Sequence, residues 1–136
     1  FYYGHSFTAH PLGCAAAMAS LDVFEEEKVL EKLPPKMALI GELAAELERS
    51  NPYVCAHRRC GMILGIDIAR PDGTPYLQDE RAGEKACVAM RPHGLLTRPC
   101  THDTIVFMPP LCISEEEIRL AFRALDAGIR EGLAAL

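Results

Sequence analysis

The 136-residue chain has a formal net charge of −5, with 49% hydrophobic and 24% charged residues, which are ordinary values for one globular domain. No apolar run approaches the roughly 20 residues that a membrane-spanning helix needs, and the 14 Lys and Arg residues are scattered through the chain, so neither a membrane nor a nucleic acid is expected as a partner. The chain begins with Phe rather than Met and with no leader-like segment, and we interpret it as a fragment of a longer protein.

The chain opens with FYYGHSFTAHPLGCA, a polar loop followed by a helix that should begin near Pro11. Gly4, the hydroxyls of Ser6 and Thr8, and the positive end of the helix dipole together suit a phosphate or another anion. The alternative is a capping loop, in which Thr8 or His10 satisfies the free amides at the start of the helix.

Two helices are expected in the first half of the chain. The first should run from Pro11 to about Lys32, with its alanine-rich start largely buried, and at roughly 1.5 Å per residue it is long enough, about 30 Å, to bridge two domains. The second should begin at Pro34-Pro35 and end near Ser50-Asn51-Pro52, with one apolar stripe that comprises Met37, Ile40, Leu43, Ala44 and Leu47.

The residue pattern in the second half of the chain predicts strands and two more helices. Residues 62–68 alternate between apolar and small or polar types, as in a strand with one buried face. A helix is expected over residues 80–90, and LLTR and TIVFM are short strands that could pair as a hairpin across PCTHD. In the last helix, Ser114 should cap the start while Glu117 reaches back to it. One side of that helix carries Ile118, Ala121, Phe122, Leu125 and Ile129.

This order of elements predicts an α+β fold, a two-layer sandwich with helices on one face of a small sheet. MPPLCIS has a structural role in this interpretation, because Pro109 and Pro110 end the last strand before the final helix begins. No internal repeat is present.

The six cysteines are expected to be reduced thiols in a cytoplasmic protein, since no secretory signal is recognisable. The clusters CAHRRC (Cys55, His57, Cys60) and CTH (Cys100, His102) contain residue types that bind zinc. Their spacing is not that of a Cys-x-x-Cys knuckle, so we favour buried thiols and surface histidines over a metal site or a redox pair.

The stretch GHSFTAHPLGCA resembles the class III pyridoxal-phosphate aminotransferases, which carry a Gly-[His/Pro]-[Ser/Thr]-[Phe/Tyr]-x-x-Asn-Pro-Leu-[Gly/Ala]-Cys-Ala segment. The LLTRPCTHDTIVFMPPLCIS stretch near the other end supports the same family, so the resemblance covers nearly the whole chain. It implies that residues 1–33 form a cofactor-phosphate loop and a long interdomain helix. Residues 34–136 would be the C-terminal small domain of a fold-type I pyridoxal-phosphate transferase.

The resemblance also implies roles for four residues. His5 and Ser6 would bind the cofactor phosphate, Gly4 would line the substrate site, and Arg98 would bind a substrate carboxylate through its guanidinium. The loop would reach the phosphate in the other subunit of a homodimer. His10 stands where the family has Asn, so the contacts of that amide are not expected here.

Such an enzyme needs a lysine to hold pyridoxal phosphate. Lys28, Lys32, Lys36 and Lys85 lie in charged helical stretches, so no catalytic residue is expected within the chain, and the lysine should lie upstream of Phe1. The fragment alone would then be inactive.

Within this family, the motifs at the two ends of the chain look most like the corresponding motifs of the aminotransferase of biotin synthesis. The resemblance implies transfer of an amino group from S-adenosylmethionine to 8-amino-7-oxononanoate, giving 7,8-diaminononanoate, although lysine remains open as the amino donor. Alternatives are a family member that acts on ornithine, acetylornithine or an ω-amino acid, and a non-enzymatic binding or dimerisation module.

Overall fold

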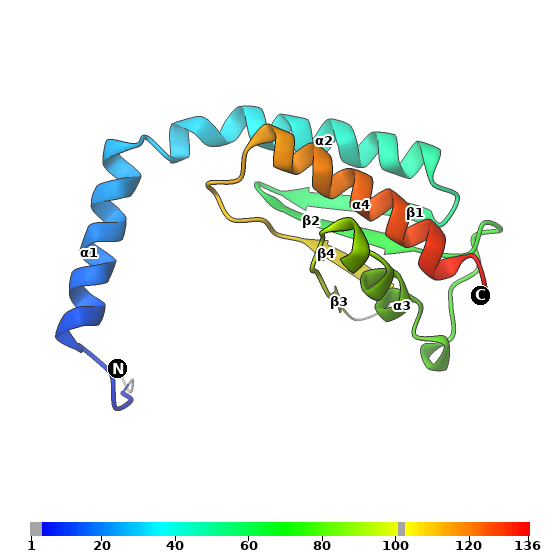
Figure 1. Ribbon diagram of the computed structural model, residues 1–136, viewed down its shortest axis with the longest axis horizontal. Helices are drawn as coiled ribbons and strands as arrows, with labels where there is room; N and C mark the ends of the chain where they lie inside the picture. The colour runs from blue at the N-terminus through cyan, green and yellow to red at the C-terminus, as the bar shows by residue number, and fades with distance from the viewer. Residues whose placement is uncertain (1–3, 101–102) are drawn as a thin grey trace. The chain divides into compact units, whose positions relative to one another are not determined.

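The computed structural model describes residues 4–100 and 103–136, and it divides into two compact units, Phe1–Pro34 and Pro35–Leu136. The first contains a turn-rich loop, helix α1 (Pro11–Glu26) and a short 3-10 turn, η1 (Leu30–Lys32) (Figure 1). None of the helices in the described part of the chain is long and apolar enough to cross a membrane.

Helix α1 differs from the sequence prediction in length and in burial. It ends at Glu26 rather than near Lys32, because Lys28 adopts a left-handed φ of 50° that interrupts the helical hydrogen bonds. None of its side chains is buried, so the predicted burial of its first turns is wrong for this chain. In its described part, the first unit has a loop and a 3-10 turn beside the helix, and these leave all of its side chains unburied.

The second unit is a two-layer α+β structure, as predicted. Its elements are α2 (Leu33–Ser50), β1 (Val54–Cys60), β2 (Ile63–Ile68), η2 (Gln78–Glu80), α3 (Ala82–Ala89), η3 (Arg91–His93), β3 (Pro99–Cys100), β4 (Thr104–Phe107) and α4 (Glu115–Leu133). The four strands form an antiparallel sheet in the order β1-β2-β4-β3. Helices α2, α3 and α4 all lie on one side of it (Figure 1). We call that side of the sheet the inner face and the opposite side the outer face.

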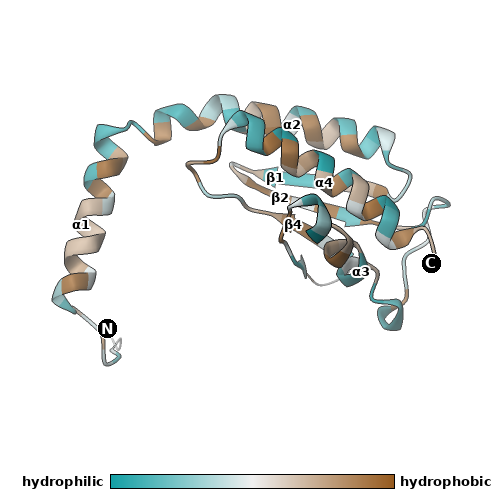
Figure 2. Ribbon diagram, in the orientation of Figure 1, coloured by the Kyte–Doolittle hydropathy of each residue, from teal (hydrophilic) through white to brown (hydrophobic). Residues whose placement is uncertain are grey.

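The core lies between the inner face and the helices. The register pairs Leu64 with Phe107 and Ile66 with Ile105, and all four side chains are buried. The Phe107 ring meets the Phe122 ring of α4 edge to face, with centroids 5.5 Å apart. Helix α4 shows its apolar stripe in Figure 2, and the predicted capping box is confirmed, since the Ser114 hydroxyl accepts from the Glu117 N–H.

Strand β1 is not among the predicted strands, because its inner-face positions are polar. His57 pairs with Ile66 and Arg59 with Leu64, which places both on the inner face. There they contact α2 rather than the apolar core: His57 pairs with Glu48, and the Arg59 guanidinium lies beside Gly41. A strand at the sheet edge that faces a polar part of a helix therefore lacks the alternation that revealed β2.

The hairpin is confirmed, although its first strand is displaced from the prediction. Pro99 pairs with Ile105 and Cys100 with Thr104, so the ladder begins after LLTR rather than within it. The backbone N–H of Val106 still donates to the carbonyl of Arg98, at 3.3 Å. The segment before β3 therefore follows β4 as an extended but irregular edge.

Helices α3 and α4 pack at very close range through two glycines of α4. A Cβ on Gly132 would lie 2.6 Å from the Cα of Ala86, and a Cβ on Gly128 would lie 2.8 Å from the Cα of Met90. This contact needs glycine at both positions, because a backbone atom cannot move aside as a flexible side chain can. It fixes α3, and with it the loops on either side, against the core.

Candidate functional site

The candidate phosphate loop closes on itself as a turn. The backbone N–H of Thr8 donates to the carbonyl of His5 at 3.0 Å, and the N–H of His5 donates to the Thr8 hydroxyl at 2.9 Å. The N–H of Phe7 donates to Nδ1 of His5. These bonds hold residues 5–8 in a compact shape in which every side chain is exposed.

The start of α1 is left without a side-chain cap. The His10 side chain makes no capping hydrogen bond, and the Thr8 hydroxyl is engaged by His5 within the turn. The capping-loop interpretation, in which Thr8 or His10 satisfies the helix amides, is therefore wrong for this structure. Within the described residues the Ser6 hydroxyl has no hydrogen-bond partner, and Gly4 is open, since a Cβ there would meet nothing within 4 Å.

Arg98 lies in the second unit, directly before β3, and its side chain is exposed. Because Pro99 pairs with the inner-face residue Ile105, Arg98 belongs to the outer face, beside Val106. In the part of the chain that the structure describes, its guanidinium has no hydrogen-bond or ion-pair partner. All five of its N–H donors are therefore available.

A second arginine on the outer face is bound within the protein. Arg58 of β1 pairs with the Asp67 carboxylate and donates to Oγ1 of Thr104 at 3.1 Å. Thr104 in turn donates to the Asp67 carboxylate. Partial burial acts to raise the pKa of Asp67, but the hydrogen bonds from Thr104 and Arg58 hold it below its ordinary value.

The Arg58-Asp67-Thr104 network joins three strands and was not found from the sequence. Arg58, Asp67 and Thr104 lie on three different strands. Only the register of the sheet shows that they are neighbours on the outer face. The network joins the strands on the outer face. Within it the Asp67 carboxylate neutralises the Arg58 guanidinium, so Arg98 is the arginine on this face that can bind an anion.

Among the residues that the structure describes, the cysteine and histidine clusters are not assembled into a metal site. No three His, Cys, Asp or Glu side chains of residues 4–100 and 103–136 are grouped as a metal would require, and His102 lies outside the described residues. The expectation of buried thiols is wrong at most positions: Cys14, Cys55, Cys60, Cys100 and Cys112 are exposed. Strand β1 lies at the sheet edge, and its outward side chains have no helix above them. Cys87 alone among the six thiols is buried, and burial raises its pKa to about 11.

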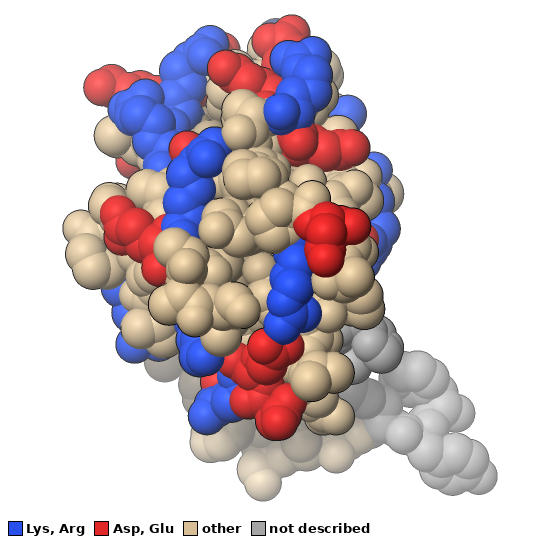
Figure 3. Space-filling view, turned by 90° about the vertical axis from the view of Figure 1, so that its right-hand side faces the viewer, with Lys and Arg blue, Asp and Glu red and all other residues tan. Residues whose placement is uncertain are grey.

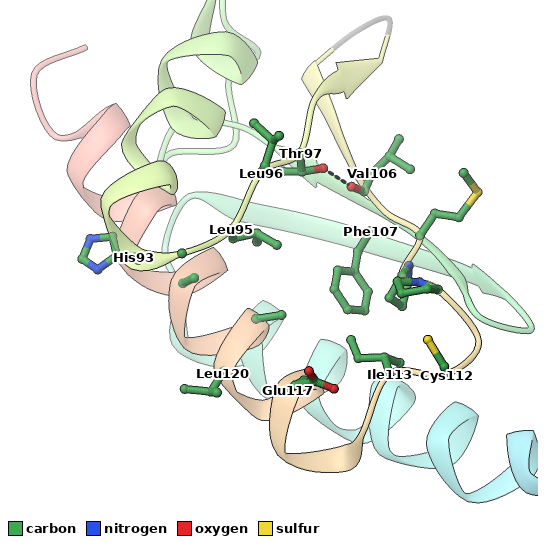
Figure 4. Close-up of a pocket in the computed structure, with 16 residues that line it drawn as sticks. His93, Leu95, Leu96, Thr97, Val106, Phe107, Cys112, Ile113, Glu117 and Leu120 are labelled. Atoms are coloured by element: carbon green, nitrogen blue, oxygen red, sulfur yellow. Dashed lines mark hydrogen bonds between the residues drawn. The ribbon is translucent and has the colours of Figure 1, made fainter.

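A groove in the second unit lies between β4, the segment before β3 and α4 (Figure 4). It has a volume of about 460 Å³ and an apolar lining that includes Leu95, Phe107 and Ile113. Figure 4 shows Phe107 turned toward α4 and Val106 turned away from it, as the alternation of a strand requires. None of the four residues singled out from the sequence lines this groove.

Charges of both signs alternate over the face of the molecule seen in Figure 3, so no surface of a single sign stands out there. The residues of interest are thus set in two places: Gly4, His5 and Ser6 in the loop of the first unit, and Arg98 on the outer face in the second. In both places a group suited to bind an anion stands exposed.

Comparison with known proteins gives a consistent result. A family described as "Aminotransferase class-III" matches residues 2–129. The adenosylmethionine-8-amino-7-oxononanoate aminotransferases of Geobacter sulfurreducens and Nitratidesulfovibrio vulgaris are 40% and 43% identical to the chain over 131 residues, or 95% of its length. The chain spans only 28% and 24% of those two relatives.

A solved structure agrees with these relatives. The crystal structure of the adenosylmethionine-8-amino-7-oxononanoate aminotransferase from Methanocaldococcus jannaschii superimposes with a TM-score of 0.86 at 32% identity, over 96% of this chain and 30% of that one. The expected likeness to the fold of these transferases is thereby confirmed.

Proposed function

Because the chain belongs to the class III aminotransferase family, we propose that it is part of a pyridoxal-phosphate enzyme of biotin synthesis. The whole protein would transfer an amino group from S-adenosylmethionine to 8-amino-7-oxononanoate, giving 7,8-diaminononanoate. The observation that carries this proposal is the 40% and 43% identity to two relatives of that name over 95% of the chain. Since the chain spans about a quarter of each relative, the activity is proposed for the whole protein.

The loop in residues 4–10 fits the phosphate end of the cofactor. Within the described residues the Ser6 hydroxyl has no partner, and the side chain of His10, the N-cap residue of α1, makes no capping hydrogen bond. A phosphate would accept hydrogen bonds from that hydroxyl and from the first N–H groups of α1, and the positive end of the helix dipole favours its charge. We assign the hydroxyl contact to Ser6, a neighbouring contact to His5, and the substrate side of the loop to Gly4.

The exposure of this loop suits a contact with another subunit. All described side chains of the loop and all of α1 are unburied, so the segment has surface available for a partner. In our proposal the protein is a cytoplasmic homodimer, and the loop of each subunit binds the cofactor phosphate held by the other. Residues 1–33 would then serve as the phosphate loop and interdomain helix, and residues 34–136 as the small domain.

Arg98 is proposed to bind the carboxylate of the substrate. A guanidinium presents two parallel N–H donors to a carboxylate, and such charge-assisted pairs are about twice as strong as neutral hydrogen bonds. By fixing one end of the substrate, Arg98 would hold the reacting carbon in place without taking part in proton transfer. The Arg58-Asp67-Thr104 network ties together strands β1, β2 and β4 of the same sheet.

Pyridoxal phosphate, when bound, supplies the electron sink for amino transfer. The lysine that holds it is proposed to lie outside these 136 residues. Lys36 is engaged as a donor to the carbonyl of Leu111 at 2.9 Å, and Lys28, Lys32 and Lys85 are exposed. None of the four is buried, as expected of lysines on solvated faces.

A product assay tests the proposed function. The whole protein with pyridoxal phosphate should convert 8-amino-7-oxononanoate to 7,8-diaminononanoate, with S-adenosylmethionine and lysine compared as donors. Turnover of ornithine or acetylornithine without formation of 7,8-diaminononanoate would contradict the assignment and favour another member of the family. A folded protein that is inactive with all of these substrates would favour a binding module.

A further inference from the structure

The segment that carries Arg98 is tied to β4 at Val106. The backbone N–H of Val106 donates to the carbonyl of Arg98 at 3.3 Å. The carbonyl of Val106 accepts from the Thr97 hydroxyl at 2.5 Å, the bond that Figure 4 marks between these two residues. Both polar backbone groups of one β4 residue therefore hold the chain at positions 97 and 98.

The Thr97 hydroxyl takes the place of a ladder bond. The register pairs Pro99 with Ile105, so Arg98 stands opposite Val106. In an antiparallel pair of this kind, the two residues exchange both of their N–H···O bonds. Among the described residues, the Arg98 N–H makes no backbone hydrogen bond to Val106, and the side chain of Thr97 supplies the donor instead.

The neighbours of Arg98 offer little else to fix its backbone. Its guanidinium is without a partner in the described part of the chain, and Leu96, two residues earlier, is 80% exposed. Pro99, the next residue, has no N–H with which to bond. The direction in which the Arg98 side chain leaves the sheet therefore depends on the two bonds at Val106.

We propose that Thr97 is the positioning residue of Arg98. Its hydroxyl, bonded to Val106, fixes the backbone from which the guanidinium extends, so that two N–H donors meet the substrate carboxylate together. Thr97 acts through Arg98 and not by contact with the substrate. The inference rests on the proposed function, because it takes Arg98 as the residue that binds the carboxylate, and it adds the residue that sets the geometry of that contact.

A bidentate contact is sensitive to such an anchor. Both N–H donors must point at the two carboxylate oxygens, so a shift of the backbone weakens one bond even when the charge stays in place. Thr97→Val keeps the branched shape and the extended backbone of threonine but removes the donor. The KM of the whole protein for 8-amino-7-oxononanoate should rise about three- to tenfold, with a smaller change in kcat.

Two variants separate the hydroxyl from the side chain as a whole. Thr97→Ser restores the hydroxyl and should return the KM to within about twofold of the unmodified value. Thr74→Val is the matched control, since the Thr74 hydroxyl donates to the Asp72 carboxylate at 2.7 Å in an exposed turn. It removes a hydrogen bond from a hydroxyl of the same kind and should leave the KM unchanged.

A double variant tests whether Thr97 acts through Arg98. In the Arg98→Gln background, Thr97→Val should cause no further rise in KM, because the guanidinium that it positions is already gone. A residue that only stabilises the fold would raise the KM by the same factor in both backgrounds.

Nonanoate provides a measurement that needs no turnover, since it has the carbon chain of the substrate but neither its amino nor its oxo group. Its dissociation constant, measured by calorimetry on the whole protein with its cofactor, should rise in Thr97→Val by about the same factor as the KM. An unchanged KM and dissociation constant in Thr97→Val, a rise that Thr97→Ser does not reverse, or an equal rise in the Arg98→Gln background would each overturn the proposal.

These measurements also separate the proposal from the proposed function. If the whole protein forms no 7,8-diaminononanoate while Thr97→Val still weakens nonanoate binding, the proposed function fails and the positioning role stands. An active protein that Thr97→Val leaves unchanged gives the reverse. The absence of both turnover and nonanoate binding in the unmodified protein would overturn both.

Discussion

The carboxylate of Asp103 accepts a hydrogen bond from the backbone N–H of Gly83 at 2.8 Å, which joins the β3-β4 hairpin to the first turn of α3. Asp103 adopts a left-handed φ of 57°, a conformation that Asp and Asn tolerate better than other non-glycine residues. A Cβ on Gly83 would lie 2.8 Å from Cβ of Pro99, so the helix start and the hairpin are in direct contact. Through this contact, α3 holds the hairpin that follows Arg98.

Replacement of Asp103 by Ala should destabilise the protein by about 1–3 kcal/mol, because it removes the helix cap and leaves alanine in a left-handed conformation. Asp103→Asn should lose less, since the amide oxygen can still accept from Gly83. Urea unfolding followed by circular dichroism measures both variants. Equal losses for Ala and Asn would contradict the role of the hydrogen bond.

Gly132→Ala should destabilise the protein by about 1–3 kcal/mol, because the added methyl would lie 2.6 Å from the Cα of Ala86 and the two helices would have to separate. Gly41→Ala in α2 is the matched control. There the methyl would meet the Arg59 guanidinium at 3.5 Å, an ordinary contact, and the higher helix propensity of alanine should stabilise by up to about 1 kcal/mol. A neutral effect at Gly132 would show that the helices pack less closely than described.

The capping box of α4 should contribute a pH-dependent stability. Hydrogen bonds from the backbone N–H and the hydroxyl of Ser114 hold the pKa of Glu117 below its ordinary value of 4.5. Because the folded state lowers this pKa, the stabilisation is fully present above the ordinary value and is lost as the pH falls through the lowered one. Unfolding free energies measured between about pH 6 and pH 3 should decline less steeply in Glu117→Gln than in the unmodified protein. Parallel profiles would refute the prediction.

Arg98→Lys should raise the KM for 8-amino-7-oxononanoate in the whole protein by about tenfold or more, because lysine keeps the charge but loses the bidentate geometry. The kcat should change less, as expected for a contact made equally before and during the reaction. Arg123→Lys, at an exposed position of α4, serves as the control and should change neither constant. A KM that is unaffected by Arg98→Lys would remove Arg98 from the substrate site.

The predictions from the sequence were most accurate for elements that are marked by a regular spacing of apolar residues or by a local capping motif. The stripe of α2, the alternation of β2 and the Ser114-Glu117 cap of α4 are each written in a few neighbouring residues, and all three appear in the structure. Strand β1 escaped because His57 and Arg59 face a helix rather than the apolar core. Helix α1 was predicted too long because nothing in its composition marks the left-handed Lys28.

The candidate site divides in the same way. Arg98 and Ser6 were found from motifs that run along the chain, whereas Asp103 and the Arg58-Asp67-Thr104 network depend on which strands and helices meet. Contacts between residues distant in sequence leave no local pattern. A tertiary structure was therefore needed to show that the arginine proposed for the substrate stands beside Val106 and Met108, which follow it only after the hairpin.

The most direct test of the account is whether the whole protein binds pyridoxal phosphate covalently. The purified full-length protein, mixed with the cofactor, should show an absorbance band near the edge of the visible range that disappears on borohydride reduction, as a lysine-linked cofactor does. After reduction, the cofactor should remain attached to a lysine outside these 136 residues. A folded full-length protein that shows no reducible band would contradict the account.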